Sequence, residues 1–146
     1  MSNLPTGCLV VRTHFGYEEA WNRLKAAAAE PNETTGYVAT VSFVDDPAFR
    51  DLTPEDLRAQ LPDDPDGPMV SFIADERALR VEGWPLLAVW VALPDPELDT
   101  SDYAPFRVLA AELGTVEANI NLANLDWDDF ADSADDDGVF RGFEEA

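Results

Sequence analysis

Cysteine and histidine each occur once in this 146-residue chain, as Cys8 and His14. A single cysteine cannot form an internal disulfide, and this scarcity fits a reducing compartment. Cys8 opens the apolar run CLVV, so we expect a small buried side chain rather than a nucleophile. A zinc site built from His and Cys would need more of these residues than the chain has. We therefore predict no metal site of that kind.

Long hydrophobic runs are also missing. No apolar run approaches the length of about 18 residues that a membrane-spanning helix needs. The opening residues, MSNLPTG, contain neither a basic region nor an apolar segment, so they do not resemble a signal peptide. We therefore predict a cytoplasmic protein that does not enter a membrane.

Basic residues are few, with 9 Lys and Arg against 30 Asp and Glu, and the formal net charge is −21. Such a charge repels nucleic-acid phosphates and anionic membrane surfaces, so we expect neither as a partner. It attracts basic proteins. Acidity that only keeps the protein soluble, or that suits a halophilic host, would produce the same composition. The hydrophobic content of 46% is sufficient for a folded core.

Motifs for phosphates and cofactors are absent as well. The chain has no GxGxxG and no Walker sequence, so we predict no cofactor. An enzyme would have its site at the carboxyl edge of the sheet, where predicted strands are followed by His14, Asp45, Asp46 and Asp75. Aspartates at such positions commonly cap turns, and a lone histidine is seldom catalytic. We therefore assign no catalytic residue.

The hydrophobic pattern that is present predicts an α/β fold. Strands are expected over 9–13, 37–44, 69–74, 86–93 and 106–109. An apolar helical stripe runs from Tyr17 to Ala28, and Thr53 with Asp56 resembles a capping box that starts a second helix. The segment 110–125 could be a helix or a short strand. The order of elements predicts one domain over 1–146, a mixed sheet of about five strands covered by three to four helices.

The segment 126–146 is predicted to be an acidic C-terminal helix and tail. Its expected core-facing stripe consists of Trp127, Phe130, Ala131 and Ala134, with Gly138 as the stop. We predict that its aspartates bind a partner: Asp126, Asp128, Asp129, Asp132, Asp135, Asp136 and Asp137. The loop 94–105 adds further acids without a base.

Calcium is a further candidate ligand for this end of the chain. The segment 133–144 partly matches an EF-hand loop, with Asp135, Asp137 and Glu144 at ligand positions. Ser133 stands where the loop requires Asp, and an exiting helix is not predicted. A helix that ends in an Asp-Gly turn is the simpler interpretation, so we predict no metal site.

Several segments together resemble a known family. They are VVRTHF (10–15), FVDDPAF (43–49), LTPEDL (52–57), PLL (85–87) and ANLDWDDFADSADDDGVFRGF (123–143). The chain resembles an actinobacterial family of small acidic domains of unknown function over most of its length, and the closing motif is the most specific part. His14 departs from the family pattern, in which an Asp commonly occupies that position. The resemblance implies a bacterial cytoplasmic α/β domain and transfers no catalytic residue.

These observations favour a binding protein over an enzyme. We predict a non-enzymatic acidic protein, an inhibitor or immunity-type module, that recognises a basic protein partner. An exposed tryptophan among Trp84, Trp90 and Trp127 could anchor the interface, although core positions are favoured for the last two. The alternatives are a small-ligand-binding or hydrolytic domain with its site at the carboxyl edge of the sheet, and a calcium-binding structural domain. The oligomeric state stays open.

Overall fold

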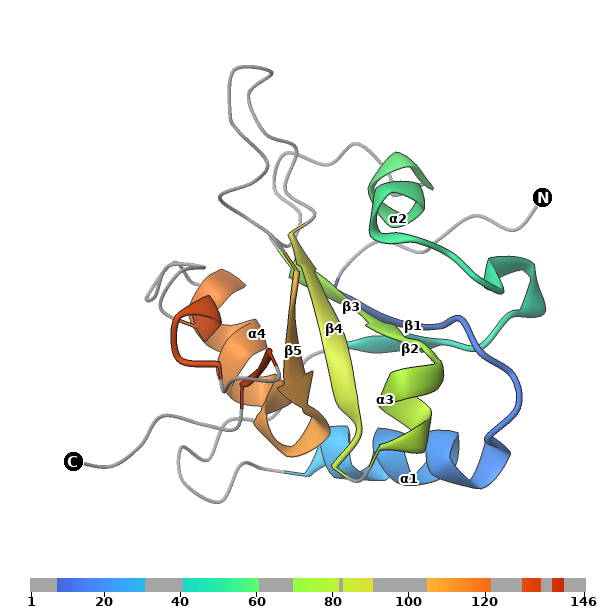
Figure 1. Ribbon diagram of the computed structural model, residues 1–146, viewed down its shortest axis with the longest axis horizontal. Helices are drawn as coiled ribbons and strands as arrows, with labels where there is room; N and C mark the ends of the chain where they lie inside the picture. Colours follow the sequence, from blue (N-terminus) through green and yellow to red (C-terminus); the bar gives the residue numbers. More distant parts are fainter. Residues whose placement is uncertain are drawn as a thin grey trace.

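Figure 1 shows the computed structural model of the chain, which describes residues 8–30, 41–60, 70–81, 83–90, 105–121, 130–134 and 138–140. The strands are β1 (Leu9–Arg12), β2 (Ser42–Val44), β3 (Val70–Ala74), β4 (Pro85–Trp90), β5 (Phe106–Leu109) and β6 (Val139–Phe140). The helices are α1 (Glu18–Ala29), α2 (Pro54–Gln60), α3 (Glu76–Arg80) and α4 (Leu113–Asn121), with 3-10 turns η1 (Pro47–Phe49) and η3 (Ala110–Glu112).

The strands form one mixed sheet in the order β2-β1-β3-β4-β5-β6. Strands β2, β1 and β3 are parallel, β4 is antiparallel to both β3 and β5, and β6 is parallel to β5. The predicted α/β class and mixed sheet are therefore confirmed. The expected strand number was one too low, because β6 is a two-residue strand that gives no alternating pattern.

Two crossovers place helices on both faces of the sheet. The chain moves from β1 through α1 to β2, and then back past β1 through η1 and α2 to β3. Right-handed crossovers in opposite directions put their helices on opposite faces. One core accordingly joins α1, α3 and α4 to the sheet through residues such as Trp21, Phe72 and Leu113. A second core on the other face packs Leu57 of α2 against Val11 and Ile73.

The start of α2 follows the expected capping box. The Thr53 hydroxyl accepts a hydrogen bond from the backbone N–H of Asp56 at 3.1 Å, and the Asp56 carboxylate accepts one from the Thr53 N–H at 3.2 Å. Pro54 occupies the first helical position, where its missing N–H is tolerated. Leu52 and Leu57 are both buried on the same core, so the short helix is fixed at its beginning.

Two local expectations need correction, and one alternative that the sequence left open is resolved. The short helix α3 was missed, because five residues are too few to show a helical period, although Asp75 caps it through the Ala78 N–H at 3.0 Å. The ambiguous segment after β5 is helical over η3 and α4. Tyr17 was wrongly placed on the buried stripe of α1, since it precedes the helix and is 38% exposed.

The remaining sequence predictions fall partly outside the described residues. This is so for 37–40 of the second expected strand, for 91–93 of the fourth, and for Trp127. Phe130 is helical and fully buried, as its place in the predicted stripe requires, and Gly138 adopts φ 80°. Within the described part of the chain, no helix is long and apolar enough to cross a membrane.

Candidate functional site

The predicted partner-binding aspartates lie mostly outside the described residues. Asp132 is described, and its side chain is exposed just after the buried Phe130. The other six are Asp126, Asp128, Asp129, Asp135, Asp136 and Asp137, and they remain predictions. The calcium alternative also stays a prediction, because Asp135, Asp137 and Glu144 lie outside the described ranges.

The described strands do fix where the acidic segments join the sheet. Segment 61–69 ends at Val70, the first residue of β3, and segment 91–104 begins after Trp90, the last residue of β4. Val70 and Trp90 are direct partners in the antiparallel β3–β4 ladder. Both segments therefore meet the sheet at the edge where the parallel strands begin, which we call the amino edge.

Two further attachment points lie on the same edge. Segment 91–104 leads through Pro105 into Phe106, the start of β5, and segment 135–137 leads into Gly138. The carbonyl of Gly138 accepts a hydrogen bond from the Arg107 N–H at 2.8 Å, which places it beside the beginning of β5. Neighbouring strands are about 4.8 Å apart, so the attachment points on β3 to β6 lie within roughly 15 Å.

These three segments contain acids and no base. Their acids are Asp63, Asp64, Asp66, Asp95, Glu97, Asp99, Asp102, Asp135, Asp136 and Asp137. Across the chain, 17 of the 30 acids fall outside the described ranges, together with a single base, Arg141. The described ranges hold the other 13 acids and 8 bases. The three segments thus hold ten of the 16 excess negative charges outside the described ranges, whereas the described residues carry an excess of only five.

The carboxyl edge carries the residues of the enzyme alternative. His14, Asp45 and Asp75 follow β1, β2 and β3, and these strands are parallel neighbours, so the structure brings them to the same edge as expected. Asp46 caps η1 by accepting from the Ala48 N–H at 3.0 Å. The turn-capping interpretation is therefore confirmed for Asp46 and for Asp75.

The Asp75 carboxylate is also bound by Arg107 of β5. The Arg107 guanidinium donates to both carboxylate oxygens at 2.7 Å, and it donates a third bond to the Pro85 carbonyl at 3.1 Å. Burial alone would raise the pKa of Asp75, but the bonds and charge of Arg107, with the Ala78 N–H, outweigh burial and lower it. A carboxylate held in its charged form in this way is a poor general acid.

Arg12 occupies the end of β1 and is 1% exposed. Its Nε donates to the His14 carbonyl at 2.9 Å, while Nη1 donates to Glu18 at 2.8 Å and to Asp45 at 3.3 Å. Its guanidinium carbon lies 4.9 Å from the ring centre of Phe15, within the range of a cation–π contact. Nη2 is buried and has no hydrogen-bond partner among the described residues. Arg12 therefore ties the first turn of α1 and the end of β2 to β1.

His14 is half-buried, and its ring packs against an aromatic neighbour. Its ring centre lies 5.4 Å from that of Tyr17, with the planes tilted by 35°. Gly16 packs against it, since a Cβ there would lie 2.8 Å from His14 Nε2. No group of three or more His, Cys, Asp or Glu able to hold a metal ion occurs in the described part of the chain.

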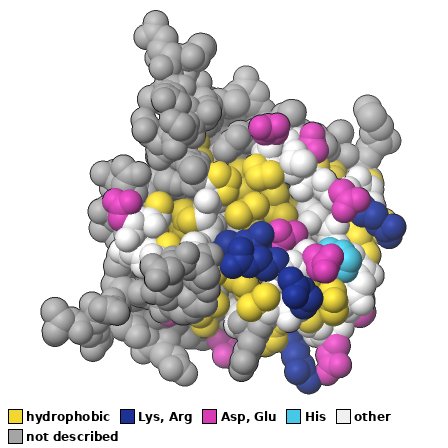
Figure 2. Space-filling model, in the orientation of Figure 1, with side chains coloured by type: hydrophobic (Ala, Val, Ile, Leu, Met, Phe, Trp, Pro, Cys, Tyr) yellow, Lys and Arg dark blue, Asp and Glu magenta, His cyan; other side chains and the backbone are white. Residues whose placement is uncertain are grey.

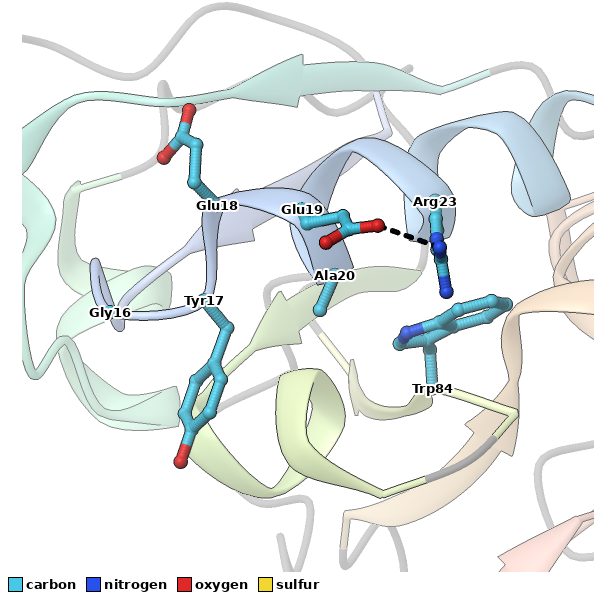
Figure 3. A pocket seen from close by; sticks show the side chains of 7 residues that line it. All are labelled: Gly16, Tyr17, Glu18, Glu19, Ala20, Arg23 and Trp84. Carbon is cyan, nitrogen blue, oxygen red and sulfur yellow. Dashed lines mark hydrogen bonds and ion pairs between the residues drawn. The ribbon is translucent and has the colours of Figure 1, made fainter.

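A shallow depression of about 380 Å³ lies at the start of α1. Figure 3 shows Trp84 and Tyr17 on either side of Ala20, with Tyr17 pointing away from the Glu19–Arg23 ion pair and that pair above Trp84. That ion pair measures 2.6 Å. Trp84 has φ 52°, in the left-handed region that bulky residues seldom adopt, and it follows Gly83 at φ 86°.

Basic side chains gather at one end of the molecule. Figure 2 shows Lys and Arg clustered below the centre of the view, over the region where Figure 1 places α1 and α3. Arg23 and Lys25 belong to α1, and Arg77 and Arg80 belong to α3. The described body is thus charge-balanced at this end, away from the amino edge.

Sequence reasoning missed Arg12 and Arg107, the arginines that pair with Asp45 and Asp75 at the carboxyl edge. It named Trp84 only as a possible interface anchor and Tyr17 only as part of the apolar stripe of α1. A charged residue inside an apolar run was an available signal for both arginines. A basic side chain on a buried strand needs hydrogen-bond or ion-pair partners, because burying an unpaired charge costs free energy. Trp84 follows Glu82-Gly83, and nothing in that dipeptide indicates a left-handed tryptophan.

A family model described as "Domain of unknown function (DUF6924)" matches residues 7–143. Comparison with curated proteins gives no match, and comparison with solved structures gives none either. Because the matched range spans nearly the whole sequence, the chain belongs to the DUF6924 family of domains of unknown function.

Proposed function

We propose that this protein is a non-enzymatic binding module that recognises a basic protein partner through the acidic segments of its amino edge. The observation that carries the proposal is the attachment of three base-free acidic segments to neighbouring strands at one edge of the sheet. A concentrated negative potential steers a basic surface toward that edge and raises the association rate. Inhibitor and immunity-type modules act by such attraction.

The arrangement of the titratable residues at the carboxyl edge favours the binding proposal over the enzyme alternative. Asp75 and Asp45 are paired with Arg107 and Arg12, and His14 is stacked on Tyr17, so none of these three is arranged as an acid–base pair with another. We infer a bacterial, actinobacterial and cytoplasmic setting for the module from the resemblance of its closing motif at residues 123–143 and from its single cysteine. Partner binding then takes place inside the cell.

The test begins with capture of partners on the immobilised chain and native mass spectrometry of the complexes. A stoichiometric basic protein is then purified, and its dissociation constant is measured by calorimetry at about 0.05 M and about 0.3 M salt. We expect the affinity to fall as salt rises, because the attraction is between separated charges. The absence of a basic partner, or an affinity that salt does not change, would contradict the proposal.

A matched pair of variants tests where the partner binds. Asp95→Asn with Glu97→Gln removes two charges from segment 91–104, and Asp51→Asn with Glu55→Gln removes two exposed charges elsewhere. We expect the first variant to weaken binding severalfold, mainly through the association rate, and the second to have little effect. Equal weakening by both would show that net charge, rather than the amino edge, attracts the partner.

A further inference from the structure

Among the described residues, two large hydrophobic side chains are exposed, and both belong to the region around Trp84. Tyr17 is 38% exposed and lines the depression beside Trp84, while Val81 is 37% exposed and its carbonyl accepts a hydrogen bond from the Trp84 N–H at 3.1 Å. Tyr17 directly precedes α1 and Val81 directly follows α3, and these two helices pack against each other. We call this region, formed by Tyr17, α1, α3, Val81 and Trp84, the α1–α3 surface.

The charge of the α1–α3 surface differs from that of the whole chain. Helices α1 and α3 together contain three acids and four bases, although the protein carries a net charge of −21. Their exposed charges form two ion pairs along the helices, Glu19 with Arg23 and Glu76 with Arg80. Two copies of so acidic a protein repel each other unless they meet at a balanced surface such as this one.

We propose that the chain forms a two-fold symmetric dimer through the α1–α3 surface. A two-fold interface requires one self-complementary patch. The exposed Tyr17 supplies a protrusion, and the depression beside Trp84 supplies a hollow on the same patch. In the dimer, Tyr17 of each copy enters the hollow of the other. Arg23 and Arg80 then face Glu19 and Glu76 across the two-fold axis.

The backbone at Trp84 fits this role. The backbone turns tightly here, with φ 86° at Gly83 and φ 52° at Trp84. At the second position, Gly or Asn would adopt the left-handed conformation at a lower cost in free energy than Trp. A tryptophan instead presents a large half-buried ring beside the hollow. Tryptophan, tyrosine and arginine are the residues that most often dominate the binding free energy of interfaces. The strained backbone conformation is therefore found at a residue whose side chain is suited to anchor an interface.

The interface is small, so the dimer is weak. Helix α1 has 12 residues and is about 18 Å long, which limits the area that each copy can contribute. We expect a dissociation constant on the order of micromolar to hundreds of micromolar. Salt screens the repulsion between the two acidic copies, so dimerisation strengthens as salt rises. This sign is opposite to that expected for the basic partner, and the two associations are tested separately.

The experiment is sedimentation equilibrium of the purified chain alone, at about 0.05 M and about 0.5 M sodium chloride. We expect a concentration-dependent dimer whose dissociation constant falls at the higher salt. Tyr17→Ser and Arg80→Glu should each raise that constant roughly tenfold or more. Both side chains are exposed, so thermal melting should show folded variants.

Arg58→Glu is the matched control, because it changes the net charge by the same amount as Arg80→Glu. Arg58 belongs to α2, on the opposite face of the sheet, and we expect the dimer of this variant to resemble that of the unmodified chain. A chain that stays monomeric at both salts up to about 1 mM would overturn the proposal. So would a dimer that neither Tyr17→Ser nor Arg80→Glu weakens.

Discussion

Arg107 in β5 holds Asp75, the residue after β3, through two 2.7 Å hydrogen bonds that pass the end of the intervening strand β4. The side chains are 14% and 31% exposed, so the pair is only partly open to water. Since Asp75 also caps α3, this one carboxylate joins a helix start to the far strand.

Asp75→Asn should lower the free energy of unfolding by about 1–3 kcal/mol at neutral pH. Asparagine keeps the ability to cap α3, so the loss reports mainly on the charge facing Arg107. Because the folded-state pKa of Asp75 is lowered, its contribution is fully present above the unfolded pKa of about 3.9 and is lost as the pH falls through the folded value. Urea unfolding at several pH values measures this difference, which should shrink in acid. A difference that stayed constant from neutral pH to strong acid would rule out the charge as its cause.

Arg12→Met should destabilise the fold by about 1–3 kcal/mol, and Arg12→Ala by more. Methionine retains much of the packing between Phe15 and Trp21, whereas alanine leaves a cavity. Glu18 and Asp45 can turn to water when the guanidinium is removed, because their side chains are 71% and 43% exposed. Arg23→Ala on the surface of α1 is the control and should change the unfolding free energy by less than about 0.5 kcal/mol. Equal effects of Met and Ala at position 12 would contradict the packing argument.

Thr53→Ala should cost about 1 kcal/mol through the loss of the cap on α2. The Thr53 side chain is exposed, so the change removes the hydrogen bond to the Asp56 N–H without opening a cavity. Thr53→Ser should recover most of the loss, which thermal melting can measure. If serine proved as destabilising as alanine, the hydroxyl would not be the stabilising group.

Gly138→Ala and Gly83→Ala should differ in severity, although both glycines have positive φ. A Cβ at Gly138 meets nothing within 4 Å, so only backbone strain of about 1 kcal/mol is expected. At Gly83 the added Cβ lies 3.0 Å from a methyl group of Leu109, which must move as well. Unfolding experiments should therefore rank Gly83→Ala as the more destabilising change. The reverse order would show that Leu109 yields at no cost.

The elements that the sequence predicted well are those with a strong period or explicit end signals. Trp21, Leu24 and Ala28 recur at helical spacing and are buried, and Thr53-Pro54 marks the start of α2. The short elements α3 and β6 were missed because their stabilisation comes from tertiary contacts. Asp75 reaches Arg107 over 32 residues, and Val139 pairs with Arg107 through a strand that no local pattern requires.

The candidate site was less predictable than the fold. The parallel arrangement of β1, β2 and β3 brings His14, Asp45 and Asp75 to one edge, as the order of elements indicated. Their pairing could not be read from spacing, because Arg12 and Arg107 approach from other strands. The acidic segments join the sheet at the opposite edge because β4 runs antiparallel to β3. The residue pattern of a strand does not reveal its direction in the sheet.

Cys8 lies at the amino edge, where its thiol donates to the Val70 carbonyl at 3.0 Å and only 7% of the residue is exposed. A thiol reagent can therefore reach it only when the start of β1 separates from β3. As the only cysteine, it gives one covalent labelling event per molecule. The labelling rate would time the opening of this edge in the native protein, with no dye or mutation introduced beforehand.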